Sequence, residues 1–127
     1  MTVEVNDLAI GITPDATVLF NLSLQDINDA ATVALNNRVT FLEENTDTTN
    51  RLKVADIVIS DDALGTNSLS LSGADVALFE IIGTELFIKA GTNLDFETNP
   101  VLDVTVEVDD PTIGTTPDNG AVFSLTL

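Results

Sequence analysis

The sequence predicts an all-β fold, a Greek-key β-sandwich of immunoglobulin-like topology with about seven strands. Three features of the 127-residue chain predict it: apolar and polar residues alternate, β-branched residues are abundant, and turn residues recur at short intervals. Alternate side chains of a strand point to opposite faces, so this alternation gives each strand one apolar face. β-Branched residues suit strands, and short strands at this spacing are typical of a sandwich.

The predicted strands are distributed along the chain after residue 17. The alternation is clearest in the runs Val18–Leu24, Leu102–Val108 and Phe123–Leu127. Shorter runs with the same character are Thr32–Phe41, Arg51–Ile59, Ser68–Leu71, Leu78–Ile82 and Glu85–Lys89. Turn residues such as Gly, Asn and Asp separate the runs. One helical turn is expected at Asp75–Phe79, and no window predicts a helix of ten or more residues.

The chain contains a long internal repeat. Thr2–Leu24 aligns without a gap on Thr105–Leu127, at an offset of 103 residues, with 13 of 23 positions identical. Self-similarity at a fixed period is the sequence signature of a repeat array. Here the period is about the size of one domain, so each copy is interpreted as the closing hairpin of a module.

This repeat predicts the domain organisation. We expect residues 1–24 to be the closing hairpin of a preceding repeat, residues 25–29 to be a linker, and residues 30–127 to be one complete repeat. The segment Gln25–Ala31 spans at most about 25 Å when extended, too short to run the length of the same sandwich. The first hairpin is therefore expected to attach loosely or to pair with another molecule, while the second closes its own module.

Charge and composition exclude several classes of function. The 21 acidic residues outnumber the four basic ones, which gives a net charge of −17. Nucleic acid and anionic lipid are poor partners for such a surface. Histidine and cysteine are absent, which removes the usual general base, the usual transition-metal ligands and any disulfide. No apolar run approaches the ~18 residues of a membrane span, so membrane insertion is not expected.

Acidic residues gather in short motifs at predicted strand ends, where a sandwich collects its loops into two poles. The motifs are "DIND" (Asp26–Asp29), "LEEN" (Leu42–Asn45), "SDDALGTN" (Ser60–Asn67) and "LDFE" (Leu94–Glu97), with Asp110 at the end of the "VTVEVDD" run. Calcium binds six to eight oxygens from carboxylates, amides and backbone carbonyls. Several short acids on neighbouring loops provide such oxygens.

In their order and spacing these motifs resemble those of a cadherin repeat. An acid before Asn after the first strand, a pair of Asp followed by Gly and Asn, an L-D-x-E, a strand ending in Asp and an Asn-Asp linker all occur in sequence. Two departures are the contiguous Asp61-Asp62 pair, where the family has D-x-D, and Ala31 near the position of the linker proline. The composition is rich in Asp, Thr and Asn and poor in Lys. In this respect the chain is more similar to the cadherin-like repeats of large bacterial surface or secreted proteins than to animal adhesion receptors.

The resemblance implies a structural module that binds Ca²⁺ between consecutive repeats. At the N-terminal pole it implies a half-site made of Asp26, Asn28, Asp29, Asp61, Asp62, Asn67 and Asp110. At the opposite pole it implies a second half-site made of Glu44, Asp95 and Glu97, which we expect to be weak because the next linker would have to complete it. The implied location is extracellular or at the cell surface. The implied partners are adjacent repeats of the same chain, with a homophilic, carbohydrate or cell-surface partner for adhesion.

Two other non-enzymatic functions stay open at this point. A carbohydrate-binding sandwich module is one, although such modules normally present Trp or Tyr platforms and this chain has neither. A metal-independent acidic stalk domain is the other, since turn chemistry alone explains Asp residues in loops. Asp95 and Glu97 imitate the carboxylate pair of a glycosidase, but that chemistry needs a sugar cleft that nothing in the sequence indicates. We therefore expect a protein that is not an enzyme.

Overall fold

The computed structural model describes residues 1–11 and 13–127 and shows an all-β protein. Ile12, which falls within the predicted first hairpin, lies outside the described residues. Nine strands are present in the described chain, so the predicted count of about seven is too low. Two of the nine form an N-terminal hairpin and seven form the two larger sheets. One short 3₁₀ helix, η1 (Val76–Leu78), lies where a helical turn was expected.

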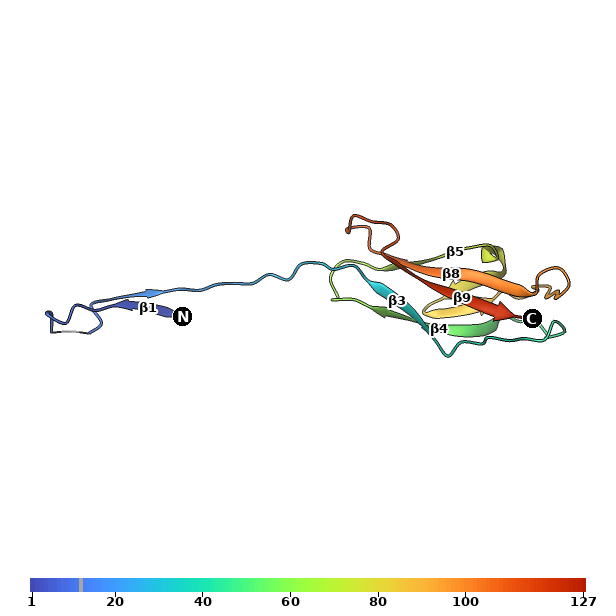
Figure 1. Cartoon of the computed structure of the whole chain (residues 1–127), viewed down its shortest axis with the longest axis horizontal. Helices are drawn as coiled ribbons and strands as arrows, with labels where there is room; N and C mark the ends of the chain where they lie inside the picture. Colours follow the sequence, from blue (N-terminus) through green and yellow to red (C-terminus); the bar gives the residue numbers. More distant parts are fainter. Residues whose placement is uncertain (12) are drawn as a thin grey trace.

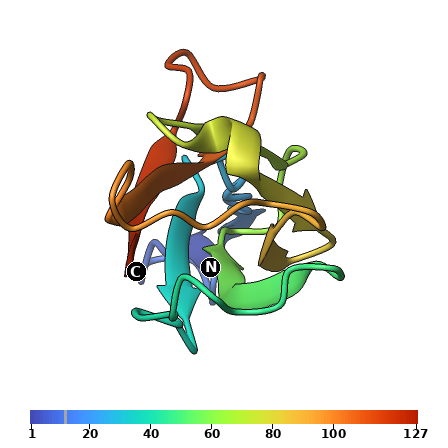
Figure 2. The ribbon, with the colours of Figure 1, turned by 90° about the vertical axis from the view of Figure 1, so that its right-hand side faces the viewer.

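The larger sheets form a β-sandwich with Greek-key connections. The four-stranded sheet has the order β3-β4-β7-β6 and the three-stranded sheet has the order β5-β8-β9. The strands are β3 (Thr32–Asn36), β4 (Leu52–Ser60), β5 (Ser68–Ser72), β6 (Phe79–Ile82), β7 (Glu85–Ile88), β8 (Val101–Asp109) and β9 (Asn119–Thr126). The chain passes from one sheet to the other after β4, β5 and β7, and every pairing within the sheets is antiparallel. Figure 2 shows this sandwich end-on.

The core lies between the two sheets and consists of the inward-facing residue of each alternating pair. In β8, Leu102, Val104, Val106 and Val108 are all buried, and the residues between them are more exposed. An edge-to-face pair of aromatic rings, with centroids 5.8 Å apart, joins the sheets: Phe79 of β6 and Phe123 of β9. The predicted alternation therefore has its physical origin in burial on one face of each strand.

The first strand of the sandwich is shorter than the sequence pattern predicts. The alternation indicated a strand from Thr32 to Phe41, but β3 ends at Asn36 and Asn37 has a positive φ of 48°. This backbone conformation, which asparagine tolerates better than most residues, ends the strand. The chain then crosses to the other sheet, where Phe41 forms a parallel bridge with Thr126 of β9.

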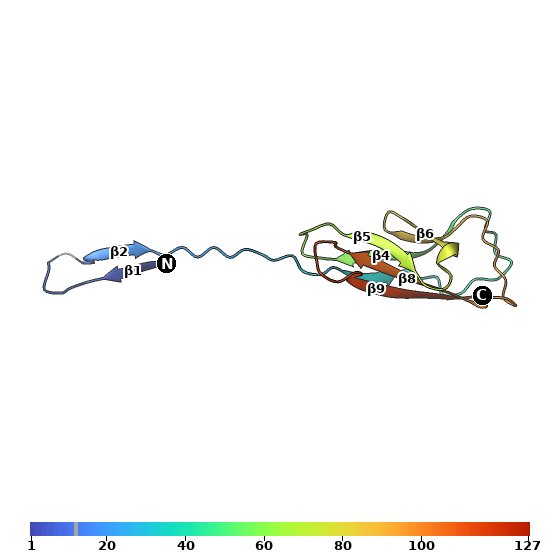
Figure 3. The same ribbon diagram turned by 90° about the horizontal axis from the view of Figure 1, so that it is seen from above.

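The N-terminal hairpin consists of β1 (Thr2–Val5) and β2 (Ala16–Leu19), which pair antiparallel. Figures 1 and 3 show it at one end of an extended segment, with the sandwich at the other end. All eight residues of its two strands are exposed. Among the described residues, no helix has the length and apolar character needed to cross a bilayer.

Candidate metal site at the N-terminal pole

We call the end of the sandwich that receives the linker the N-terminal pole. Three segments meet there: the end of the linker at Asn28 and Asp29, the β4–β5 loop at 61–67, and the β8–β9 loop at 110–118. β4 and β8 both end at this pole, and β5 and β9 both begin there. The sandwich topology therefore brings together acidic motifs that are more than 80 residues apart in the sequence.

Asp110 is the centre of the hydrogen-bond network at this pole. Its side chain is almost fully buried, with 1% of its surface exposed. Oδ1 accepts hydrogen bonds from the backbone N–H (2.9 Å) and the hydroxyl (2.7 Å) of Thr112. Oδ2 accepts from the backbone N–H of Thr66 (3.0 Å) and from the side-chain amide of Asn28 (3.1 Å). A buried carboxylate requires partners of this kind, and here they tie the two loops and the linker to one residue.

Gly65 allows the β4–β5 loop to approach this carboxylate. Its φ is +71°, in the left-handed region that favours glycine. A Cβ atom added at this position would overlap Oδ2 of Asp110 and lie 2.6 Å from Nδ2 of Asn28. The glycine in the "ALGTN" motif therefore has a packing role as well as a turn role.

The hydrogen bonds also change the acidity of Asp110. The Asn28 amide, followed by the N–H and hydroxyl of Thr112, lowers the pKa of Asp110 from 3.8 to about 2, against the opposing effect of burial. A carboxylate whose pKa is lower in the folded state binds its proton more weakly there than in the unfolded chain. Its contribution to stability is thus fully present above about pH 4 and is lost as the pH falls toward 2.

We expect this titration to appear in the acid unfolding of the protein. Between pH 5 and pH 2, the free energy of unfolding of the wild type should fall more steeply than that of Asp110→Asn, measured by urea denaturation at each pH. Asp47 and Asp56 also have lowered pKa values, but they are present in both proteins and cancel in the comparison. Parallel curves for the two proteins would show that Asp110 does not contribute this dependence.

The other predicted ligands of this pole form pairs around the same loops. The side-chain amide of Asn67 donates to Oδ2 of Asp61 (2.6 Å). Oδ2 of Asp62 accepts from the backbone N–H of Asp29 (2.9 Å), while its Oδ1 accepts from the N–H of Leu64 (2.8 Å). The end of the linker is thus attached to the sandwich through Asn28 and Asp29.

In the part of the chain that the structure describes, four oxygens at this pole are buried without a hydrogen-bond partner. They are side-chain Oδ1 atoms of Asn28, Asn67, Asp109 and Asp118. Each belongs to a residue whose other contacts lie in the network: Asp118 accepts from the N–H of Asp110 (2.7 Å), and Asp109 pairs with Ser68 beside Asn67. Buried acceptors without a partner are costly, and a bound cation is one way to satisfy them. All four are hard oxygen donors, the type that Ca²⁺ prefers.

The acidic side chains do not surround one common point. Within residues 1–11 and 13–127, no three acidic groups are arranged so that they could hold a metal ion directly. Asp26 lies on the linker outside the network and accepts a hydrogen bond from the N–H of its neighbour Ile27 (3.1 Å). The four oxygens without a hydrogen-bond partner come from both amides and carboxylates.

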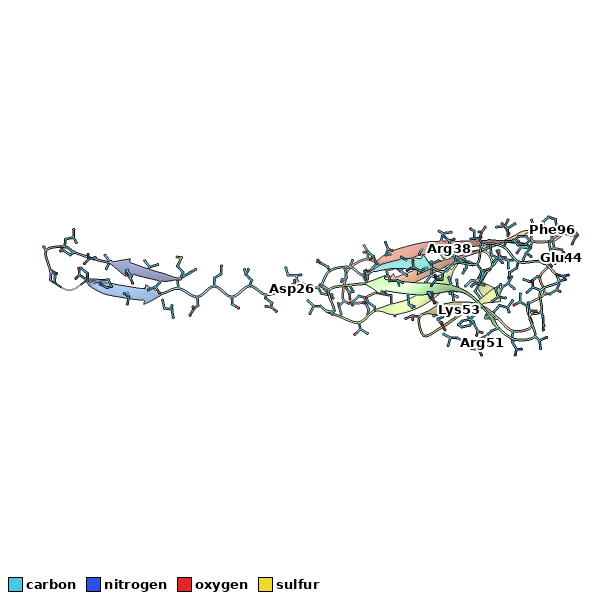
Figure 4. The ribbon with its side chains drawn as sticks, turned by 90° about the horizontal axis from the view of Figure 1, so that it is seen from below. Asp26, Arg38, Glu44, Arg51, Lys53 and Phe96 are labelled. Carbon is cyan, nitrogen blue, oxygen red and sulfur yellow. The ribbon has the colours of Figure 1, made fainter. Side chains whose placement is uncertain are left out.

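The opposite pole holds the remaining predicted ligands. Oε2 of Glu44 accepts from the backbone N–H of Phe96 (3.2 Å), and both oxygens of Asp95 accept hydrogen bonds from Thr98. Glu97 lies exposed in the same loop. Figure 4 shows Glu44 and Phe96 together at this end of the molecule, with Asp26 at the linker on the other side. The structure thus brings the Glu44 and Asp95 motifs together.

Two residues of the candidate site, Asp109 and Asp118, were not predicted from the sequence. Both stand beside a predicted feature: Asp109 precedes Asp110, and Asp118 belongs to the repeated Thr-Pro-Asp phrase. The repeat alignment pairs Asp118 with Asp15, which was a signal that this position has a structural role. Thr112, which donates twice to Asp110, was not predicted either.

Comparisons with known proteins identify the fold. No family model matches the chain, and no curated protein matches it. Among solved structures, the chain is similar to the crystal structure of human protocadherin-24 EC1-2, with a TM-score of 0.55 and 22% sequence identity. The match covers 79% of this chain and 44% of the protocadherin chain. The sandwich is therefore a cadherin-like β-sandwich.

Proposed function

We propose that the protein is a non-enzymatic, calcium-binding, cadherin-like module of a tandem-repeat extracellular protein, serving adhesion or acting as a spacer stiffened by calcium. The observation that carries the proposal is the set of four buried side-chain oxygens at the N-terminal pole that lack a hydrogen-bond partner. The cadherin-like fold and the order of the acidic motifs support the choice of Ca²⁺.

In this proposal the ion would be held by the oxygens of Asn28, Asn67, Asp109 and Asp118, with Asp61 and Asp62 close by in the same loops. These residues come from the linker, the β4–β5 loop and the β8–β9 hairpin. A cation bound to all three would fix the angle at which the linker leaves the sandwich. It would also offset the mutual repulsion of the acidic residues, which belong to a chain of net charge −17.

The tandem arrangement is part of the same proposal. The repeated closing phrase at Thr2–Leu24 and Thr105–Leu127 supports residues 1–24 as the end of a preceding repeat, residues 25–29 as the junction and residues 30–127 as the following repeat. Adjacent repeats would then be the first partners of this module. An exposed, acidic, Cys-free surface is compatible with an extracellular or cell-surface location.

Thermal unfolding with different salts tests the proposed function. Calcium at a hundredfold excess over Kd should raise the melting temperature by about 10–20 °C, because a ligand that binds the folded state alone at this excess stabilises it by about 2.7 kcal/mol, and about 1 kcal/mol shifts a small domain by ~4–8 °C. Magnesium should do less, because it requires a tighter octahedral shell. Sodium chloride at matched ionic strength should also do less, because it acts through screening alone.

A pair of double variants makes this test specific to the pole. Asp109→Asn with Asp118→Asn removes two charges from the candidate site and should abolish most of the calcium increment. Glu43→Gln with Glu107→Gln removes the same charge elsewhere and should leave the increment unchanged. If calcium and sodium chloride shift the wild-type melt equally, the protein is a metal-independent acidic stalk domain instead.

A further inference from the structure

The N-terminal hairpin is a structural copy of the hairpin that closes the sandwich. β1 and β2 pair in the register Val3↔Val18 and Val5↔Ala16, and the aligned part of β8 and β9 pairs in the same register 103 residues later. The connecting loops also correspond. The N–H of Ile10 donates to the carbonyl of Asp7 (3.0 Å), and in the second copy the N–H of Ile113 donates to the carbonyl of Asp110 (3.0 Å).

The side chain of the first Asp in each loop makes corresponding contacts. Oδ1 of Asp7 accepts from the N–H of Ala9 (2.9 Å), as Oδ1 of Asp110 accepts from the N–H of Thr112 (2.9 Å). The N–H of Asp7 donates to Oδ2 of Asp15, as the N–H of Asp110 donates to Oδ2 of Asp118. The two hairpins therefore share strand register and loop hydrogen bonds as well as sequence.

Corresponding apolar side chains of the two hairpins differ in solvent exposure: they are buried in the closing hairpin and exposed in the N-terminal hairpin. Phe123 and Leu125 are fully buried, whereas their counterparts Phe20 and Leu22 are 50% and 72% exposed. Val106 is also fully buried, and its counterpart Val3 is 53% exposed. Because directly opposed residues share a face of a hairpin, Val3 and Val18 lie together on an apolar face that no other described part of the chain covers. An isolated two-stranded hairpin is marginally stable in water.

We propose that the N-terminal hairpin is a closing element for the sandwich of a second copy of this chain whose own closing hairpin is displaced. The position it would occupy is the one that β9 and the aligned part of β8 occupy. There Phe123 packs edge-on against Phe79 and lies under the guanidinium of Arg38, 5.4 Å from the ring centroid. Leu125 and Leu127 are also buried in the core there. The backbone of Thr126 adds two hydrogen bonds: its N–H donates to the carbonyl of Thr40, and its carbonyl accepts from the N–H of Leu42.

A second copy, and not the same chain, is the partner that the linker length allows. The hairpin residue that corresponds to Leu127 is Leu24, so in the closing position Leu24 would lie at the far end of β9 from the start of β3. β9 has 8 residues and a length of about 27 Å. Residues 25–31 reach about 25 Å when fully extended, which leaves nothing for a path around the sandwich.

In the wild type, the chain's own closing hairpin should occupy the closing position of the sandwich in preference to the N-terminal hairpin of another copy. It continues directly from the first residues of β8 in the same chain, which gives it a high effective concentration. It also provides one contact that the copy cannot make: Oδ1 of Asn119 accepts from the N–H of Val33 (3.1 Å), and the corresponding residue of the first hairpin is Ala16. Exchange between intact chains buries no additional apolar surface, so we expect it only when the resident hairpin is disabled.

The test disables the resident hairpin in the full-length chain. Phe123→Asp with Leu125→Asp should convert a folded monomer into a folded dimer or a larger head-to-tail oligomer, measured by sedimentation equilibrium together with circular dichroism. Adding Phe20→Asp with Leu22→Asp should abolish both folding and association. Adding Thr17→Asp with Leu19→Asp, on the opposite face of the hairpin, should leave the oligomer intact.

Each other outcome would overturn the proposal. An unfolded monomer would mean that the first hairpin cannot replace the second, and a folded monomer would mean that it does not act on a second copy. Association that is insensitive to the Phe20 and Leu22 substitutions would mean that another surface is responsible. The experiment is done in EDTA, so its result does not depend on whether the proposed calcium function is correct.

Discussion

Phe123→Ala will lower the free energy of unfolding by about 3–5 kcal/mol, whereas Phe20→Ala will change it by less than about 0.5 kcal/mol. The two residues occupy corresponding positions of the repeated hairpin. Phe123 is fully buried against Phe79, and its removal leaves a cavity between the sheets. Phe20 is half exposed on a hairpin that contributes nothing to the core of the sandwich.

Guanidinium denaturation followed by circular dichroism measures both values, since the chain contains neither Trp nor Tyr as a fluorescent probe. The matched pair uses the same chemical change in the same local sequence, so differences in intrinsic strand propensity largely cancel. Similar losses for the two variants would contradict the assignment of Thr105–Leu127 as the hairpin that closes the sandwich.

Gly65→Ala is the second substitution with a large expected effect. An alanine at φ +71° costs about 1–2 kcal/mol because its Cβ crowds the backbone in the left-handed region. The same Cβ would overlap the Asp110 carboxylate, and relieving such overpacking costs a further ~1–3 kcal/mol. We therefore expect a total loss of about 2–5 kcal/mol in the free energy of unfolding.

Gly91→Ala is the matched control for this prediction. Gly91 has a similar φ of +78°, but a Cβ atom there would have no other atom within 4 Å. The Gly91→Ala variant should therefore lose only the part of the free energy of unfolding that the left-handed backbone conformation costs. If Gly65→Ala and Gly91→Ala lose the same stability, the close packing of the β4–β5 loop on Asp110 is not important for the fold.

The fold was largely predictable from the sequence because its strands have two chemically different faces. The alternation in Leu102–Val108 corresponds to the buried and exposed residues of β8, and the internal repeat indicated a closing hairpin. The end of β3 was not predictable from alternation, since the apolar pattern continues beyond Asn37 while the backbone turns away. A periodic pattern reports which faces are buried and does not report which sheet a residue joins.

The candidate site was predictable only in part. The resemblance to a cadherin repeat implied that Asp110 and the 61–67 loop would share a pole, and the strand topology of the structure places both there. The sequence did not indicate that the oxygens of Asp110 would be taken up by Thr112, Thr66 and Asn28. Which oxygens stay without a partner depends on how each side chain is oriented in the folded loops. For that reason the unpartnered oxygens of Asp109 and Asp118 were identified only in the structure, although the repeat alignment had indicated a structural role for Asp118.

Calorimetric titration of the full-length chain with Ca²⁺ tests the central claim most directly. The account predicts saturable binding at the N-terminal pole with a Kd of about 10⁻⁴–10⁻³ M, the range of extracellular modules. Asp109→Asn with Asp118→Asn should remove that binding, while Glu43→Gln with Glu107→Gln should preserve it. Heats that match simple dilution, or binding that is equally strong in all three proteins, would contradict a calcium site formed by the linker and the two loops.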